Sequence, residues 1–520
     1  MLNIPAIHGW MTFHRLNRLV SSSVSRNVRS GFTPESNNFL YVAASCLPYH
    51  ISGYTSRTHE ILKALKNQFR NLNLFVLTRT GYPWDRRDSL TFPADDQAFS
   101  ELDGIRYDHL RTPANNRLTA IYAEQASAEI EKYLIANHIS CVHAASNHVN
   151  ALPALIAAKR LGIRFQYEIR GLWALTRISR MPEFEKSHNF KLGLDLEAFV
   201  AAHADRVFVI SEQLSLYIQR EWNISPEKIF LLPNCASREL ASVTAPGGSY
   251  LSASDCENHN ESMITDNAPV PELQTDLQTY RQAEPVTIGY AGSLIVYEGL
   301  QTLIKAVDLL VHQKKFNVHL NIIGDGEYRE ALENLTVSLE LNECVTFFGR
   351  LSPEDARRKQ EECSLICIPR EPFEVCRIVP PIKLAEAMAK GRCVVVPDLP
   401  VFIDETRAES PAGVCGQDLR STKSEVGGDK NPGSENHGSF ENYADGVPSL
   451  EMLSNNGSGC IFFHSGNEMS LADVLGRYLR HPYDLRDRGI LARQYVLKHR
   501  QWNMFTGQMI APAVNRNKDE

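Results

Sequence analysis

A lysine and a glutamate stand three residues apart where a helical stretch begins late in the chain. The segment reads Pro380-Pro-Ile-Lys-Leu-Ala-Glu-Ala-Met-Ala-Lys-Gly391. Lys383 and Glu386 share one face of that helix. An ammonium group can hold phosphates, and a carboxylate can accept two hydrogen bonds from ribose hydroxyls. The pair therefore predicts a nucleotide site, with an intrahelical Lys–Glu ion pair as the structural alternative.

A glycine-containing loop earlier in the chain also suits a phosphate. Gly292 and Gly299 bracket the loop between the apolar run Val286–Ala291 and a helical stretch. Backbone N–H groups at such a turn can receive a diphosphate, because a helix N-terminus carries positive partial charge. Alone, this loop is a weak signal.

Two ionisable side chains lie where another apolar strand opens into a loop. Glu168 and Arg170 belong to Tyr167-Glu-Ile-Arg-Gly-Leu-Trp173. Charged groups at the end of a buried strand are costly unless they face a ligand or each other. The pattern predicts either site residues or a structural pair, because strand alternation puts both side chains on one face.

A turn-rich loop near the N-terminus precedes a helix and holds three further candidates. His50, Gly53 and Arg57 belong to the stretch from Leu47 to Arg57, which leads into a helical pattern from about Thr55 to Gln68. Gly53 would let the backbone approach a ligand closely, and the helix N-terminus favours negative charge. The alternative is an ordinary strand-to-helix loop.

These loops must be positioned by the regular alternation of strands and helices that starts at residue 38. Strands are predicted at Phe39–Ser45, Leu72–Thr78, Cys141–Ala145, Phe165–Ile169, Val207–Ile210, Ile229–Leu232, Val286–Ala291, Val318–Ile323, Val345–Phe348, Leu365–Ile368 and Cys393–Val396. Strands that alternate with helices are typical of parallel sheets, in which ligands bind at the carboxyl ends of the strands. The chain is therefore predicted to be α/β, with two doubly wound, Rossmann-like domains.

Changes in composition mark the predicted domain borders. The first domain covers 38–235 and the second 286–490. Polar stretches at 236–285 and about 410–458 are interpreted as a linker or insertion and a low-complexity insertion. Residues 1–37 have four arginines and no acid before Glu35, and they are predicted to be a disordered basic extension. Such an extension could touch an anionic membrane weakly.

Overall composition excludes several classes of protein. A length of 520 residues favours more than one domain, and the net charge of -7 argues against a general nucleic-acid binder. No apolar run approaches the length of a membrane-spanning helix. The 11 cysteines form no CxxC pair, so buried free thiols in a reducing cytosol are expected instead of disulfides or zinc ligands.

Taken in order, these motifs resemble bacterial glycosyltransferase family 4, the group 1 glycosyltransferases of the GT-B fold, used in exopolysaccharide and lipopolysaccharide assembly. The matching stretches are Pro48–His59, Tyr167–Gly171, Ala204–Ser211, Leu232–Asn234, Gly289–Gly299, Ile322–Gly326, Phe348–Leu351 and Lys383–Gly391. The resemblance implies a GT-B fold whose domains face a cleft. The first domain would bind the acceptor and the second the donor, while a returning helix at about 495–512, with Trp502, would cross to the first domain.

The resemblance also implies an activity. The protein would transfer a sugar, with retention, from a nucleotide sugar to a glycan or lipid-linked acceptor in polysaccharide biosynthesis. No DxD motif is evident, so neither a metal nor another cofactor is expected. The protein would be cytoplasmic, and contact with a lipid-linked acceptor would place it at the cytoplasmic face of the inner membrane.

Residues carried over from the family form three groups. Arg170 and Glu168 would be catalytic, and His50, Gly53 and Arg57 would form the acceptor-side loop. The donor-binding residues would be Gly292, Ser293, Arg350, Arg370, Lys383 and Glu386.

Three departures from the family pattern concern the same site. Arg170 replaces a histidine and stays protonated, so it cannot be a base, although it can donate to a sugar or phosphate oxygen. Ser293 and Glu298 stand where the family often has Arg and Lys, which makes Lys383 the first choice for the phosphates. Ile378 replaces the first glutamate of the paired-glutamate motif.

Two alternatives to transfer remain at this stage. A GT-B nucleotide-sugar epimerase would need acid and base groups, for which His50, His143 and His148 are the histidine candidates. The missing first glutamate and Arg170 instead favour a degenerate, non-catalytic binding subunit.

Overall fold

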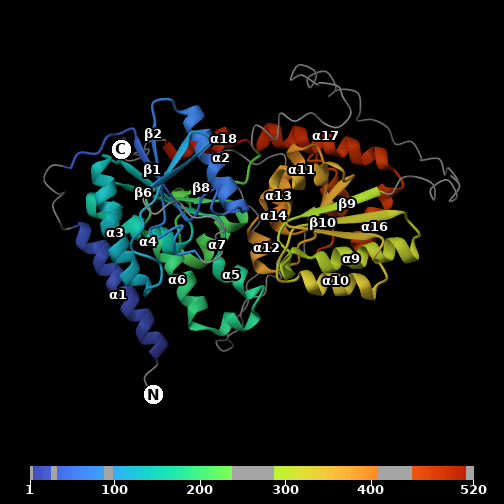
Figure 1. Ribbon diagram of the computed structural model, residues 1–520, viewed down its shortest axis with the longest axis horizontal. Coiled ribbons are helices and arrows are strands. Elements are labelled where there is room, and N and C mark those ends of the chain that lie inside the picture. The colour runs from blue at the N-terminus through green and yellow to red at the C-terminus, as the bar shows by residue number, and fades with distance from the viewer. Residues whose placement is uncertain (1–3, 25–31, 87–97, 237–285, 408–447, 511–520) are drawn as a thin grey trace, which may run out of the picture.

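The computed structural model describes residues 4–24, 32–86, 98–236, 286–407 and 448–510. Two α/β domains lie side by side, each built around a twisted sheet with helices on both faces (Figure 1). This architecture confirms the predicted pair of doubly wound domains. The polar segments 237–285 and 408–447 lie outside the described residues, so most of the two predicted insertions is not addressed by the structure.

The N-terminal domain has an eight-stranded sheet in the order β3-β4-β2-β1-β5-β6-β7-β8. All described pairings are parallel except the β3–β4 hairpin, which was not predicted. The strands are β1 Asn38–Ala43, β2 Asn73–Thr78, β3 Phe99–Leu102, β4 Ile105–Asp108, β5 Cys141–Ala145, β6 Arg164–Ile169, β7 Arg206–Val209 and β8 Ile229–Leu231. The helices are α1 Ile4–Val24, α2 Gly53–Gln68, α3 Thr119–Ala136, α4 His148–Leu161, α5 Trp173–Ile178, α6 His188–His203 and α7 Glu212–Trp222.

The C-terminal domain has a six-stranded parallel sheet in the order β11-β10-β9-β12-β13-β14. Its strands are β9 Val286–Ala291, β10 Val318–Ile323, β11 Val345–Gly349, β12 Leu365–Cys367, β13 Cys393–Pro397 and β14 Ile461–Phe463. Its helices are α9 Leu300–Asp308, α10 Arg329–Ser338, α11 Pro353–Glu361, α12 Glu374–Ile378, α13 Ile382–Ala389, α14 Pro400–Glu405, α15 Leu450–Ser454, α16 Glu468–Leu479 and α17 Pro482–His499.

The two domains share part of one hydrophobic core. Apolar side chains from α3, α4, α6 and α7 belong to the same buried cluster as those of α12, α13, α14 and α17. The opposite face of the first sheet packs against α2 and the last helix, α18 (Trp502–Ile510). The domains therefore meet through packed side chains as well as through the connecting chain.

The chain returns to its first domain at the C-terminus, as predicted. In Figure 1 the red helix α17 runs along the C-terminal domain, and α18 lies against α2 of the N-terminal domain. The crossing is held by a parallel bridge between Ala236 and Gln501 and by a buried ion pair between Arg500 and Glu405. Trp502 is buried in the returning segment, but the helix that returns is 502–510 and not the longer stretch that was predicted.

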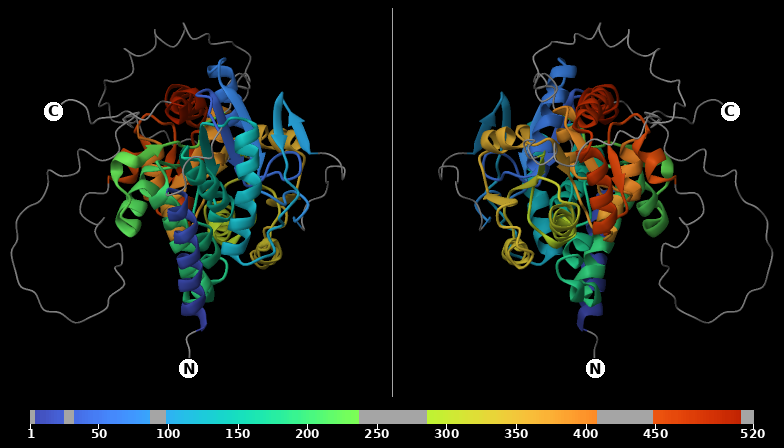
Figure 2. Two further views of the ribbon diagram at one scale, coloured as in Figure 1. Left: turned by 90° about the vertical axis from the view of Figure 1, so that its left-hand side faces the viewer. Right: turned by 90° about the vertical axis from the view of Figure 1, so that its right-hand side faces the viewer.

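The prediction of disorder over 1–37 is wrong for residues 4–24, which form α1. Leu16 and Val20 are buried against α3, α4 and α6, and this apolar stripe stabilises the helix. Figure 2 shows the blue helix projecting past the rest of its domain toward the N-terminus. The serines and arginines of this segment favoured the prediction of disorder. The apolar stripe that packs the helix is short and was not recognised in the sequence.

The structure tests two further predictions, one of which is wrong and one confirmed. Residues 450–454, assigned to the low-complexity insertion, form α15 and pack on β14, because Leu453 is buried there. The nine cysteines of the described segments are free, and all but Cys344 are buried. None of the described helices is long and apolar enough to cross a membrane.

Candidate active site

A buried carboxylate, Glu168, is the centre of a polar cluster in the N-terminal domain. Glu168 is the last residue but one of β6, and its side chain has an exposed fraction of 0%. Its Oε1 accepts from Arg57 Nη2 at 2.8 Å and Nε at 3.0 Å. Its Oε2 accepts from Arg170 Nη2 at 2.9 Å and from the Tyr41 hydroxyl at 2.8 Å, and His143 Nε2 lies 3.3 Å away.

The two arginines outweigh the cost of burying this acid. Burial alone would raise the pKa of Glu168, but Arg170 and Arg57 hold the pKa well below its usual range. Burial would lower the pKa of Arg170, yet Glu168 raises it, so both groups stay charged. The cluster therefore carries two cations and one carboxylate.

Arg57 belongs to this cluster and not to the acceptor-side loop. It lies inside α2, is buried, and its Nη groups donate to Leu232 O at 2.6 Å and Pro233 O at 2.8 Å. The family resemblance assigned Arg57 to the acceptor-side loop, but Ser52 caps α2 and the helix begins at Gly53. Arg57 thus fixes the end of β8 and cannot contact an acceptor in this structure.

Glu168 is likewise a positioning residue here, which corrects the predicted catalytic role. Both of its oxygens are occupied and neither reaches the surface. The structural pair left open by the sequence is therefore real. Arg170 differs, because its Nε is buried and has no hydrogen-bond partner among the described residues. Its Nη1 donates to Tyr54 O at 3.0 Å and to Thr58 Oγ1 at 2.7 Å.

A second buried carboxylate, Glu298, is the centre of a matching cluster in the C-terminal domain. Its Oε1 accepts from Arg370 Nη2 at 2.9 Å. Its Oε2 accepts from Lys383 Nζ at 2.6 Å and lies 3.2 Å from the Tyr290 hydroxyl. Lys383 Nζ also donates to that hydroxyl at 3.0 Å. Glu298 thus brings together Arg370 and Lys383, the two predicted donor cations. From the sequence, Glu298 was noted only as an acid at a position where the family often has a cation.

The charge states of this second cluster follow from the same balance. Burial opposes ionisation of Glu298, but Arg370 and Lys383 lower its pKa to about 2. Burial lowers the pKa of Lys383, an effect that Glu298 opposes and Arg370 reinforces. Arg370 Nε is buried without a hydrogen-bond partner among the described residues, as in Arg170. In each of the two clusters, one buried arginine therefore keeps an Nε–H with no hydrogen-bond partner among the described residues.

Glu386 lies one turn further along α13 and does not pair with Lys383. Lys383 points to Glu298 instead, so the intrahelical ion pair is not formed. Burial raises the pKa of Glu386, and Lys390 and Lys383 oppose the shift. Among the described side chains, Glu386 has no hydrogen-bond partner, and its carboxylate is therefore available to a ligand.

The predicted glycine loop differs in detail from a diphosphate cradle. The Gly292 and Leu294 N–H groups already donate to Ile323 O at 2.9 Å and Asp325 O at 3.1 Å. Gly292 is nevertheless required, because a Cβ there would lie 2.5 Å from Lys383 Nζ. The loop thus makes room for a cation, and of the three N–H groups at 292–294 only that of the exposed Ser293 remains for a phosphate.

The remaining predicted residues are spread around this centre. Gly53, at the start of α2, faces the start of α13, since a Cβ there would lie 3.0 Å from Ile382 Cγ2. His50 lies 3.3 Å from Ser45 Oγ on the loop before α2. Arg350 is exposed after β11 and is not joined to the Glu298 cluster.

A short segment between α12 and α13 connects the two clusters. Its three successive carbonyls, those of Ile378, Val379 and Pro380, accept from Ser211 Oγ at 2.5 Å, Arg370 Nη1 at 2.8 Å and Asn234 Nδ2 at 2.9 Å. Asn234 Oδ1 in turn accepts from Arg57 Nη1 at 3.0 Å. A continuous polar chain therefore runs from Glu168 across the domain boundary to Glu298.

Sequence reasoning missed four members of this network: Tyr41, Asn234, Tyr290 and Glu298 as a partner. Asn234 and Glu298 were noted only as parts of motifs. Tyr41 and Tyr290 are buried inside β1 and β9, where a buried hydroxyl needs a polar partner. A tyrosine in the first strand of each domain was the available signal.

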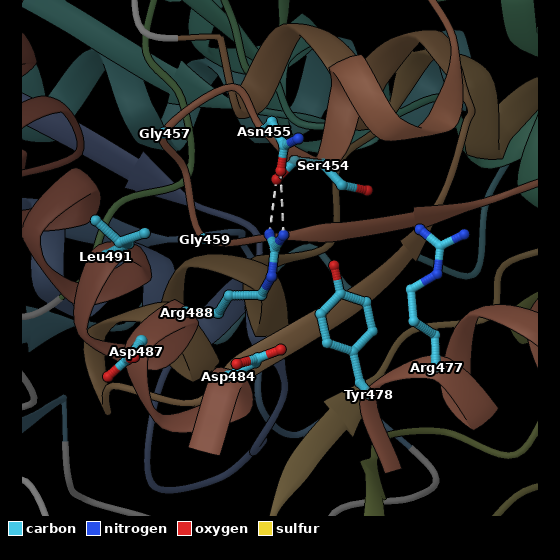
Figure 3. A pocket seen from close by; sticks show the side chains of 10 residues that line it. All are labelled: Ser454, Asn455, Gly457, Gly459, Arg477, Tyr478, Asp484, Asp487, Arg488 and Leu491. Carbon is cyan, nitrogen blue, oxygen red and sulfur yellow. Dashed lines mark hydrogen bonds between the residues drawn. The ribbon is translucent and has the colours of Figure 1, made fainter. Parts of the chain in front are cut away.

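A separate cavity of about 400 Å³ lies at the far side of the C-terminal domain. Figure 3 shows Arg488 pointing to Ser454 and Asn455, with Asp484 and Asp487 below it. Arg488 Nη1 donates to Ser454 O at 2.6 Å. The cavity is lined by two arginines and two aspartates, so its charges balance, and none of the predicted site residues lines it.

Two Rossmann-like domains joined by a returning C-terminal helix define the GT-B class of folds. Each domain matches a known protein family. Residues 52–235 match the family described as "Glycosyl transferase 4-like domain", and residues 285–416 match the family described as "Glycosyl transferases group 1". The chain belongs to this family of group 1 glycosyltransferases, as the resemblance predicted.

Sequence relatives share a shorter stretch. An uncharacterised glycosyltransferase of Haemophilus influenzae is 33% identical over 113 residues, which are 22% of this chain and 30% of the relative. A second, from Methanocaldococcus jannaschii, is 29% identical over 117 residues, or 22% and 28% of the two chains. The match therefore covers less than a third of each curated relative's length.

Solved structures resemble the whole fold. Sucrose-phosphate synthase from Thermosynechococcus elongatus matches with a TM-score of 0.59 at 15% identity, over 91% of this chain and 97% of the other. Anabaena HepE in complex with UDP-glucose matches with a TM-score of 0.53 at 13% identity, over 91% and 98%. At such identities the likeness concerns the fold.

Proposed function

We propose that this chain transfers a sugar, with retention of configuration, from a nucleotide-sugar donor to a glycan or lipid-linked acceptor. The carrying observation is that Lys383 and Arg370 are brought together beside α13, with an unused N–H on Arg370. A cation pair of this kind suits a diphosphate. The likeness in fold to HepE with bound UDP-glucose supports a nucleotide-sugar donor.

The chemistry needs little from a protein base. Arg170 stays protonated, so it donates to a sugar or phosphate oxygen and cannot remove a proton. The leaving diphosphate would take the proton of the acceptor hydroxyl on the same face as the departing bond. The protein then contributes positioning and stabilisation of the developing charge. No metal or other cofactor has a place in this proposal.

Incubation with a panel of nucleotide sugars, with and without an acceptor, tests the proposed reaction. Nucleotide release that depends on a glycan or lipid-linked acceptor is the expected result. Sugar isomerisation without release would instead identify an epimerase. The geometry disfavours that alternative, because His143 is buried beside Glu168 and His148 Nδ1 lies 3.0 Å from Glu197 Oε1.

A donor-binding subunit without activity is the second candidate. Two observations favour this candidate. Glu298 lies beside the proposed donor cations, and Ile378 stands where the family has the first glutamate of its paired-glutamate motif. Donor binding without turnover over the whole panel would establish this candidate and contradict transfer.

Glu386→Ala is expected to weaken donor binding by about 10- to 100-fold, the loss of one charged hydrogen-bond acceptor. The free carboxylate is proposed to accept from the ribose hydroxyls. Because burial raises the pKa of Glu386, wild-type donor affinity should also fall as the pH drops toward that pKa. Calorimetric titration with the donor measures both effects. Glu354→Ala, on the exposed surface of α11, is the control, and equal affinity in both variants would refute the ribose role.

Contact with a membrane surface is the remaining part of the proposal. Trp10 and Met11 are 66% and 59% exposed on α1, and Arg18 is exposed further along the helix. The described helix contains no acid. Such a face suits anionic headgroups above an apolar layer, as a cytoplasmic enzyme with a lipid-linked acceptor requires.

The double variant Trp10→Ser, Met11→Ser should sediment with phosphatidylglycerol vesicles at least tenfold less than wild type, since each side chain loses roughly 1.5–3 kcal/mol of burial. Tyr483→Ser, which alters an 85% exposed residue of the C-terminal domain, should not differ from wild type. Equal sedimentation of all three proteins would contradict docking through α1.

A further inference from the structure

Glu298 is a buried acid beside the two cations that we propose for the donor phosphates. Its side chain is 5% exposed and contacts both Arg370 and Lys383. An acid in this position repels the diphosphate that the same cations would attract. Its presence therefore needs a physical explanation beyond orientation of the cations.

Hydrogen bonds show which donors Glu298 leaves unused. Lys383 Nζ has three N–H groups, and it donates to Glu298 and to the Tyr290 hydroxyl. Arg370 uses Nη2 for Glu298 and Nη1 for Val379 O, while Nε has no partner among the described residues. At least one donor on each cation therefore remains for an anion.

Charge completes the description of the cluster. Burial and the nearby Glu298 raise the pKa of Tyr290, so this phenol stays neutral. Two cations and one carboxylate give a net charge of one positive unit. Without Glu298, two cations would be buried side by side with no counter-ion, which is costly in the empty protein.

We propose that Glu298 is a built-in counter-anion of the donor site, which holds Lys383 and Arg370 together before the donor binds and weakens binding of the diphosphate product. This inference rests on the proposed function. Affinity for a product limits how fast it leaves, and product release sets the turnover of many enzymes. Glu298 thus keeps the site stable when empty and reversible when filled.

Glu298→Gln tests the proposal, because it removes the charge and keeps the shape. Asp473→Asn is the matched control, since it makes the same change on a 70% exposed side chain of α16. Wild type and both variants are titrated calorimetrically with UDP, ADP, GDP and inorganic pyrophosphate. A pH of about 6.5 keeps Lys383 protonated in the variant.

Glu298→Gln is expected to bind pyrophosphate and at least one nucleoside diphosphate about tenfold or more tightly, with a steeper loss of affinity in salt. Its melting temperature should be lower than that of wild type without ligand and should rise more on adding pyrophosphate. Asp473→Asn should match wild type. Equal or weaker binding of pyrophosphate by Glu298→Gln would overturn the proposal and leave orientation as the only role of Glu298.

The outcomes separate this inference from the proposed function. Failure of wild type to bind any of the three nucleotides would contradict donor binding. Tighter pyrophosphate binding by Glu298→Gln would still uphold the counter-anion role in that case.

Discussion

Glu168→Gln is expected to lower the free energy of unfolding of the N-terminal domain by about 3–5 kcal/mol. The substitution leaves Arg57 and Arg170 buried with no counter-ion, and breaking a buried pair costs about this much. Denaturation by urea, followed by circular dichroism, measures the change. The size of the effect follows from the number of groups that share this carboxylate, which include Tyr41 and His143.

Glu183→Gln provides the control within the same domain. Its carboxylate is 86% exposed, so its loss should change stability by no more than about 0.5 kcal/mol. A similarly small change for Glu168→Gln would contradict the assignment of Glu168 as the centre of a buried ion-pair cluster.

Acid should weaken the wild type through the same residue. The folded-state pKa of Glu168 is depressed, so its contribution to stability is present above the unfolded pKa of about 4.3 and is lost as the pH falls below it. Glu168→Gln should therefore lose less stability than wild type between neutral pH and the acid range.

Lys383→Met is expected to weaken nucleotide-sugar binding by about 10- to 100-fold, the cost of one charged hydrogen bond to a phosphate. Methionine keeps an apolar stem like that of the lysine and removes the ammonium, which lies 4.3 Å from the centroid of the Tyr290 ring. Glu298 retains Arg370 as its partner, so the fold should survive. Titration with the donor measures the loss, and the melting temperature checks the fold.

Lys314→Met, which alters a lysine paired with Asp473 on the outer surface, is the control for charge. Unchanged donor affinity in Lys383→Met would remove this lysine from the donor site. A loss equal to that of the control would point to net charge instead of a direct contact.

Agreement between sequence and structure was best where the pattern is local. Strands such as β9 and β10 begin and end where their apolar runs do, because a buried parallel strand needs apolar side chains on both faces. The hairpin of β3 and β4 was missed because its residues alternate weakly, with only Ser100 among the four of β3 buried. α1 was missed because its apolar stripe is short.

Local sequence patterns did not predict which charged groups form ion pairs with each other. Helical spacing offered Glu386 as the partner of Lys383, yet the structure pairs Lys383 with Glu298, 85 residues earlier in the chain. Likewise Arg57 pairs with Glu168, which is 111 residues away. These choices depend on which elements pack together, and low local dielectric then makes the closest opposite charge dominate.

By itself, the sequence determined the two doubly wound domains, the family and two cations that the structure brings together, Arg370 and Lys383, because periodicity and short motifs are local properties. Only the tertiary structure decided which carboxylates neutralise those cations. It turned Glu168 and Arg57 from expected substrate contacts into a buried support, and it made Glu298 the partner of Lys383 and Arg370. The physical reason is that these buried ion pairs form between elements that are distant in the sequence and meet only after the chain has folded.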